Sequence, residues 1–135
     1  MASSKMTAIY FHPWFLQFKI GTKSHPSDKA LSALYGDLLN TEIASRFIYP
    51  ELSIATDELL LLNHTHENLD WVKESTDIFY DEDQDSSIPS VEKIARLAVG
   101  ATVDGIEKVM SGQVDRAFLL TRPGGHHAEA ESAMG

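Results

Sequence analysis

The chain has 135 residues, of which 43% are hydrophobic, and its net charge is −9. This length and composition fit one globular domain with a buried core, and the negative charge disfavours nucleic acid as a partner. The sequence contains no cysteine, which excludes disulfides, thiolate metal ligands and a cysteine nucleophile. Apolar runs such as Leu59–Leu62 are far shorter than the roughly 20 residues of a membrane span, and no signal-peptide pattern begins the chain. We therefore expect a cytoplasmic protein without a membrane partner.

The first third of the sequence predicts a strand followed by a helix. Residues 1–6 are small or polar and are expected to form a disordered lead, with a single domain over residues 7–135. Thr7–Phe11 is rich in β-forming residues, ends at His12-Pro13 and predicts a buried strand. Ser27 is a suitable N-cap for the helix that follows. Its core-facing stripe is predicted to consist of Leu31, Leu34, Tyr35, Leu38 and Leu39.

The middle of the chain alternates short elements with one long loop. Glu51–Ala55 predicts a short strand, and Thr56 is an expected N-cap for the helical turn that follows it. Thr65–Ser75 predicts another short helix. Asp81–Pro89 is dense in acidic residues and serine, as is typical of a loop. This acidic run fits either a solvated loop or a rim that attracts a cationic substrate.

The last third predicts the longest helix and a final strand. Ser90 is the expected N-cap and Gly112 the expected end of the helix, with an apolar face between them. Gly100 and Gly105 each disfavour a helix by about 1 kcal/mol relative to alanine, so we expect close packing on a sheet to compensate. Residues 117–121 form an apolar run that predicts a central parallel strand buried on both faces. The order of strands and helices indicates the α/β class.

A candidate site follows this last strand. Arg122-Pro123 leaves the carboxyl end of the strand, where open α/β sheets place their ligands. Gly124-Gly125 permits a sharp turn, and His126-His127 comes next. On an extended stretch the two imidazoles would point in different directions, so one could face a reacting atom while a carboxylate holds the other. The same residues also fit a surface loop with two solvated histidines.

Residues 122–128 read Arg-Pro-Gly-Gly-His-His-Ala and closely resemble the Arg-Pro-Pro-Gly-His-His-Ala signature of the histone deacetylase and acetylpolyamine amidohydrolase superfamily. His25-Pro26, residues 61–67 (Leu-Leu-Asn-His-Thr-His-Glu) and residues 98–102 resemble the N-terminal part of the same family, so the similarity covers about residues 7–135. Gly124 departs from the second proline, and residues 27–29 depart from an arginine-containing segment of the family. The resemblance implies the N-terminal portion of an arginase/deacetylase-like three-layer fold, in which helices flank a parallel sheet.

The family's reaction is hydrolysis of an acyl amide, typically on acetylated lysine or acetylpolyamine, by a zinc-bound water. By resemblance, His127 is the general base and later the proton donor to the leaving amine, while a deeper His126, paired with a carboxylate, tunes it. Gly135 would offer its backbone carbonyl to the substrate amide. Asp85 would orient the substrate backbone, with Asp83 as a near rival.

The sequence also departs from the family where the metal would be held. The family's zinc ligands, an Asp-x-His pair and a second Asp, and its oxyanion-stabilising tyrosine are not found among these 135 residues. Catalytic zinc needs three protein ligands, and we expect neither bound zinc in this chain alone nor a substitute site built from its six histidines.

Three hypotheses follow for function. The first is an N-terminal fragment or truncated form of a zinc-dependent deacetylase-like amidohydrolase, inactive by itself and completed by a C-terminal chain. The second is a non-catalytic module derived from such an enzyme, which works by self-association or partner binding through an uncovered strand edge. The third is an unrelated α/β domain with an accidental histidine pair.

Overall fold

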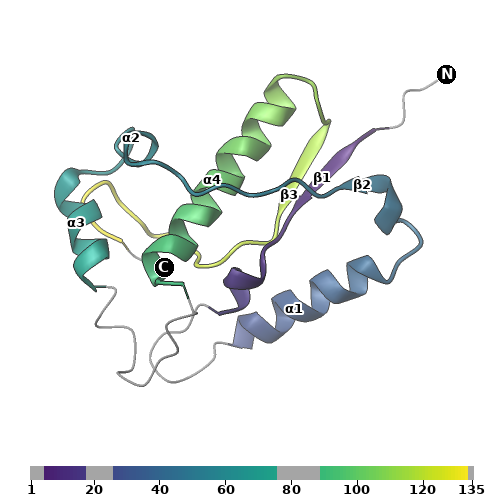
Figure 1. The fold of residues 1–135 in the computed structure, drawn as a ribbon, viewed down its shortest axis with the longest axis horizontal. Helices are drawn as coiled ribbons and strands as arrows, with labels where there is room; N and C mark the ends of the chain where they lie inside the picture. The colour runs from purple at the N-terminus through teal and green to yellow at the C-terminus, as the bar shows by residue number, and fades with distance from the viewer. Residues whose placement is uncertain (1–4, 18–25, 76–88, 134–135) are drawn as a thin grey trace.

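The structure is a computed structural model that describes residues 5–17, 26–75 and 89–133. The described elements, drawn in Figure 1, are, in chain order, β1 (Thr7–Tyr10), the 3-10 turn η1 (Pro13–Leu16), α1 (Pro26–Leu39), η2 (Ala44–Arg46), β2 (Phe47–Ile48), α2 (Asp57–Leu60), α3 (His66–Ser75), α4 (Val91–Met110) and β3 (Arg116–Leu119). Within these ranges no helix combines the length and the apolar character needed to cross a bilayer.

The described strands form one parallel sheet in the order β2-β1-β3. β1 pairs with β3 along its whole length, from Thr7 opposite Arg116 to Tyr10 opposite Leu119. The backbone amide of Leu120 extends this pairing by donating to the carbonyl of Tyr10 at 2.9 Å. Because β1 alone has a neighbour on each side, it fixes the relative positions of the other two strands.

The expectation that residues 117–121 form a central strand buried on both faces was wrong for the described sheet. β3 lies at its edge, and Phe118 is 51% exposed. The cause is that, among the strands that the structure describes, β3 pairs with β1 alone, and that α1 only partly covers the second face of β3.

Helices lie on both faces of the sheet because successive side chains of a strand point to opposite sides. On one face, Ala8 and Tyr10 of β1 pack against Ala101 of α4. On the other, Ile9 and Phe118 face Leu34 of α1. The prediction of a parallel sheet flanked by helices is thereby confirmed.

Two of the three predicted N-caps, Thr56 and Ser90, are confirmed, whereas the prediction of Ser27 was wrong because α1 begins one residue earlier, at Pro26. The Ser90 hydroxyl accepts a hydrogen bond from the amide of Lys93 at 3.2 Å, and the Thr56 hydroxyl accepts one from the amide of Leu59 at 3.4 Å. Gly112, with φ of 73°, follows the end of α4. These two caps satisfy amides that a helix would otherwise leave unpaired at its first turn.

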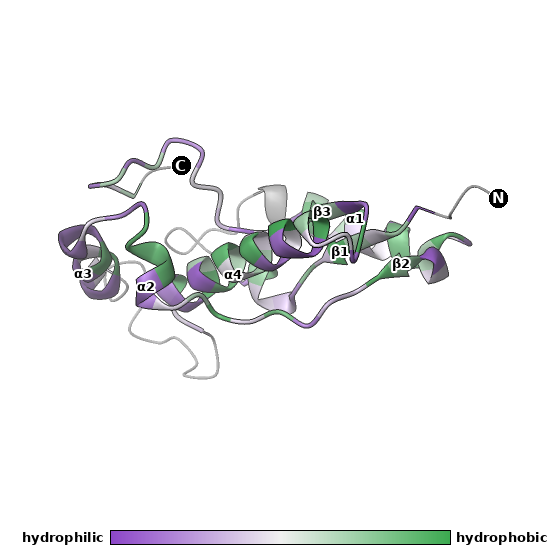
Figure 2. Cartoon of the chain, turned by 90° about the horizontal axis from the view of Figure 1, so that it is seen from above, coloured by the Kyte–Doolittle hydropathy of each residue, from purple (hydrophilic) through white to green (hydrophobic). Residues whose placement is uncertain are grey.

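α4 carries the main core of the described chain. Ile94 and Leu97 pack with Phe15 of η1, and Figure 2 shows the helix with hydrophobic and hydrophilic stripes along its length. The stripe predicted for α1 is less buried than expected: Leu34 is 49% and Leu39 46% exposed. α1 therefore contacts the sheet with only part of its apolar face.

The strand predicted at Glu51–Ala55 is absent from the structure, and β2 (Phe47–Ile48) lies earlier in the chain. Residues 51–56 run instead along α4, where the Ala55 amide donates to the carbonyl of Arg96 at 3.1 Å and the Arg96 guanidinium donates back to the Ala55 carbonyl at 3.1 Å. A Cβ atom added at Gly100 would lie 1.9 Å from the carbonyl oxygen of Ser53. Gly100 thus permits the close approach of this extended segment, while Gly105 packs on the sheet as predicted, next to Ala117.

A hydrogen-bonded network joins β1 to α4. The hydroxyl of the fully buried Tyr10 donates to a carboxylate oxygen of Asp104 at 2.6 Å, and the Lys108 ammonium lies 2.5 Å from the other oxygen. Burial, followed by the bond to Asp104, raises the pKa of Tyr10. Burial raises the pKa of Asp104, but the hydrogen bonds from Lys108 and Tyr10 outweigh it, so the pKa lies below its usual value.

Candidate functional site

The tandem histidines lie in the segment that leaves the carboxyl end of β3. The amide of Ala128 donates to the carbonyl of Gly125 at 2.9 Å, which closes a turn with His126 and His127 at its two central positions. Gly125 has φ of 109°, a backbone conformation that L side chains rarely adopt. Of the two glycines before the histidines, the second is therefore the one whose backbone conformation favours glycine.

The turn brings the two imidazoles together. Their ring centroids lie 4.0 Å apart with planes inclined by 46°. The expectation that His126 and His127 point in different directions was wrong, because they occupy the corner of a turn rather than an extended stretch.

The structure also differs from the expectation of a deep His126 paired with a carboxylate. Both His126 and His127 are exposed, and within the described ranges no carboxylate lies at ion-pair distance from either ring. The physical reason is that the turn lies on the surface of the described part. The predicted substrate-binding residues Asp85 and Gly135, and the rival Asp83, lie outside the described residues.

The segment after the histidines is held by the junction between α2 and α3. Ala130 accepts hydrogen bonds at its carbonyl from the amide of Thr65, at 3.0 Å, and from the side-chain amide of Asn68, at 3.3 Å. The Nδ1 atom of His64 lies 3.1 Å from the carbonyl oxygen of Glu129. In Figure 1 the yellow C-terminal segment runs beside α2 and α3. We call residues 121–130, which carry the tandem histidines, the histidine loop. We call His64, Thr65 and Asn68 its anchor.

Sequence reasoning missed this anchor. The only signal was the family resemblance of residues 61–67, which linked this segment to the tandem histidines without assigning it a role. Its partners lie more than 60 positions further along the chain, so local patterning could not reveal the contact.

His12 lies at the carboxyl end of β1, at the same edge of the sheet as the histidine loop, but has a structural role. Its Nδ1 atom accepts a hydrogen bond from the amide of Trp14 at 3.1 Å and so caps η1. Burial lowers the pKa of His12, which favours the neutral ring with its proton on Nε2. His12 is thereby engaged as a helix cap.

The His, Asp and Glu side chains of the described residues can be compared with the ligands that a catalytic zinc ion needs. In residues 5–17, 26–75 and 89–133, no three side chains of His, Asp or Glu come together as a group that could hold a metal ion. His126 and His127 form a pair, and His64 is turned to Glu129. The described residues do not fit catalytic zinc, which needs three protein ligands. The chemistry they offer is proton transfer by imidazole.

Fold and site together define a parallel-sheet α/β protein with a tandem-histidine turn at the carboxyl edge of the sheet. Residues 25–135 match the histone deacetylase domain family. The chain belongs to this family. It is 33% identical over 102 residues to histone deacetylase 5 of Arabidopsis thaliana, covering 69% of this chain and 16% of that protein. It is 29% identical over 113 residues to polyamine deacetylase HDAC10 of Danio rerio, covering 78% of this chain and 17% of that protein.

A solved structure shows the same arrangement. The crystal structure of the HDA15 HD domain superposes with a TM-score of 0.78 and 29% sequence identity, covering 97% of this chain and 39% of that one. The chain thus spans less than half of the solved domain and less than a fifth of the two curated relatives. The predicted deacetylase-like fold is confirmed.

Proposed function

We propose that this chain contributes the proton-transfer histidines of a deacetylase-type site that hydrolyses acetylated lysine or acetylpolyamine amides. The observation that supports this most strongly is the turn that places His126 and His127 side by side at the carboxyl edge of the sheet, in a chain of the histone deacetylase family. The names of the two relatives point to histone and polyamine substrates. The chain's own net charge of −9 suits cationic substrates of either kind.

The roles of the two rings follow from the proposed reaction. A neutral His127 takes a proton from the water that attacks the amide carbonyl, and the resulting imidazolium returns it to the nitrogen of the leaving amine. His126, with its ring 4.0 Å away, sets the electrostatic field in which His127 gains and loses this proton. Asp85 is proposed to orient the substrate backbone, and Gly135 to accept a hydrogen bond from the substrate amide.

The isolated 135-residue chain is proposed to be inactive. Family members use zinc to polarise the amide carbonyl, and the Asp-x-His pair and second Asp that hold it are not among these 135 residues. Metal analysis of the purified chain after dialysis against zinc should give well below one zinc per chain, with no release of acetate from an acetyl-lysine peptide. One zinc per chain together with turnover blocked by a hydroxamate would overturn this part of the proposal.

A chimera tests the catalytic proposal in a positive sense. Residues 7–133 would replace the matching segment of the HDA15 HD domain, to which 97% of the chain aligns. The chimera should deacetylate an acetyl-lysine peptide or N-acetylputrescine under conditions where the unaltered domain is active. A chimera that folds, as shown by circular dichroism and by a cooperative melting transition, but turns over neither substrate would contradict the proposal.

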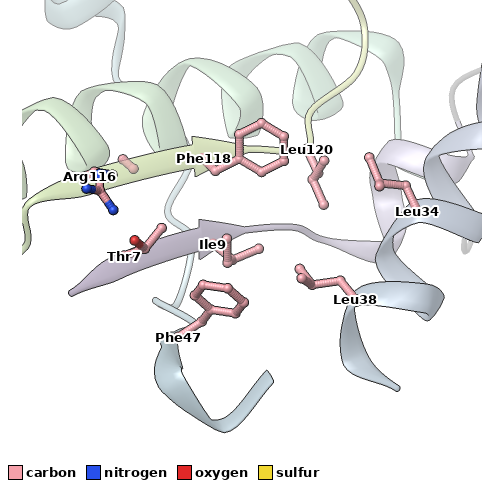
Figure 3. A pocket seen from close by; sticks show the side chains of 9 residues that line it. Thr7, Ile9, Leu34, Leu38, Phe47, Arg116, Phe118 and Leu120 are labelled. Carbon is pink, nitrogen blue, oxygen red and sulfur yellow. The ribbon is translucent and has the colours of Figure 1, made fainter. Parts of the chain in front are cut away.

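A second candidate function is self-association, which one observation favours. The sheet face opposite α4 carries an open apolar hollow of about 370 Å³, lined by side chains that include Ile9, Leu34, Leu38, Phe118 and Leu120. Figure 3 shows Leu34 and Leu38 of α1 pointing towards the sheet across this hollow. Exposed apolar surface beside an edge strand promotes association. Light scattering would show a dimer at micromolar concentration if this candidate is correct, and a monomer at millimolar concentration would rule it out.

A further inference from the structure

We propose that the anchor, and Asn68 in particular, positions the tandem histidines for proton transfer by holding the segment that follows them. The inference deepens the proposed function and rests on it for its catalytic meaning. Asn68 acts on His126 and His127 through the backbone of the segment that follows them, so it is a positioning residue rather than a catalytic one.

The geometry of Asn68 makes it a specific donor to the loop. The residue is 4% exposed, and its side-chain amide nitrogen lies 3.3 Å from the carbonyl of Ala130 and 3.2 Å from Nδ1 of His64. The carbonyl of Ala130 can only accept a hydrogen bond, so the amide must present its NH₂ group to it. The reverse orientation would place its carbonyl oxygen against the carbonyl of Ala130. Burial keeps water from replacing a lost bond, so the donor is costly to remove.

The anchor sits close enough to the histidines to set their position. Only Ala128 separates His127 from Glu129, and the amide of Ala128 closes the turn around the two rings. At the other end of the loop, the amide of Leu120 is bonded to Tyr10 at the end of β1. The histidine turn is therefore held by hydrogen bonds on both sides, to the sheet before it and to the start of α3 after it. Loss of the hydrogen bonds at the start of α3 would remove the attachment on the C-terminal side of the turn.

The His64 ring completes the arrangement. Its Nδ1 atom lies between the carbonyl of Glu129, at 3.1 Å, and the side-chain amide of Asn68, at 3.2 Å. A proton on Nδ1 lets the ring donate to Glu129, and its absence lets the ring accept from Asn68. In either state the ring ties the loop, directly or through Asn68, to α3.

The test is a near-isosteric substitution in the 135-residue chain. Asn68→Asp replaces the donor by a carboxylate oxygen that faces the carbonyl of Ala130, while Asn63→Asp makes the same change at an exposed position as a matched control. Amide exchange and imidazole contacts would be followed by NMR. In Asn68→Asp, the Thr65 amide should exchange about tenfold faster, the factor expected for one lost hydrogen bond. The cross-relaxation signal between the His126 and His127 rings should weaken severalfold.

In the same variant the Leu120 amide, which is bonded to Tyr10, should exchange as in the parent chain and show that the sheet is intact. Asn63→Asp should leave all three signals unchanged. An unchanged ring-to-ring signal in a folded Asn68→Asp variant would overturn the proposal. The readout requires neither metal nor substrate, so a failed anchor and a failed deacetylase assignment are distinguished.

Substitutions of His64 keep the test decisive if Asn68→Asp does not fold. His64→Ala removes the contact with Glu129 and should weaken the ring-to-ring signal. His64→Asn places an amide nitrogen close to the position of Nδ1 and should restore the signal, whereas His64→Gln places it near Nε2 and should not. Equal signals in His64→Ala and His64→Asn would contradict a positioning role.

Discussion

Gly100→Ala is expected to destabilise the protein even though alanine is the better helix former. The added Cβ would lie 1.9 Å from the carbonyl oxygen of Ser53, a backbone atom that cannot rotate away. Displacing this segment costs about 2 kcal/mol as overpacking and about 1 kcal/mol for the bond from the Ala55 amide to Arg96, against about 1 kcal/mol gained in helix propensity. We expect a net loss of about 2 kcal/mol in the free energy of unfolding.

Gly36→Ala in α1 is the matched control, because a Cβ at Gly36 meets nothing within 4 Å. This variant should gain up to about 1 kcal/mol. Urea unfolding followed by circular dichroism at 222 nm measures both, and a difference of about 3 kcal/mol with slopes of roughly 1–3 kcal/mol per molar urea places the two midpoints about 1–3 M apart. If Gly100→Ala proves as stable as Gly36→Ala, the close packing of residues 53–55 on α4 is refuted.

Three further predictions concern the network at Tyr10 and the histidine turn. The folded pKa of Asp104 is lowered, so the stability that this carboxylate gives the fold is present above its unfolded pKa of about 3.9 and is lost as pH falls through the folded value. Urea midpoints measured from about pH 6 to pH 2 should therefore drop less in Asp104→Asn than in the parent chain. Tyr10→Phe should cost about 1 kcal/mol at pH 7 for the lost hydrogen bond. Because the folded pKa of Tyr10 is raised, the parent chain should lose more stability than Tyr10→Phe as pH rises above about 10, and equal alkaline profiles would contradict this. Gly125→Ala, at φ of 109°, should strain the turn by about 1–3 kcal/mol and shift the NMR signals of both histidine rings, whereas Gly124→Ala, which lacks a positive φ, should leave them in place.

Local signals predicted the elements whose ends depend on neighbouring residues. The caps at Thr56 and Ser90 and the stop at Gly112 rest on hydrogen bonds or dihedral angles within a few residues, and each is present. β1 was identified from its run of β-forming residues, and α4 from its long and regular apolar pattern. Such elements are determined by the chain around them.

Tertiary competition decided the elements that were missed. Residues 51–55 have strand-like composition, but the amide of Ala55 finds its acceptor on α4 instead of on a strand. The run at 117–121 is apolar enough for a central strand, yet its burial depends on which neighbours cover it. Composition does not reveal which partner is nearest in space.

In the candidate site, too, some features were evident from the local sequence and others depend on tertiary contacts. The tandem histidines and their place after β3 were evident from the sequence, because a Gly-Gly turn and the family signature mark them. The contact between their rings depends on the turn closed at Gly125, and the anchor at Asn68 depends on proximity across more than 60 residues. Neither is encoded in local spacing.

The most direct test of the central claim is the effect of His127→Ala on kcat/KM in the chimera with the HDA15 HD domain. Loss of a general acid–base group should lower kcat/KM by about 100- to 10,000-fold. His66→Ala, an exposed histidine at the first position of α3, serves as the control and should change kcat/KM less than about twofold. Equal activity of the His127→Ala and His66→Ala chimeras would contradict the account, because the paired imidazoles would then have no part in proton transfer.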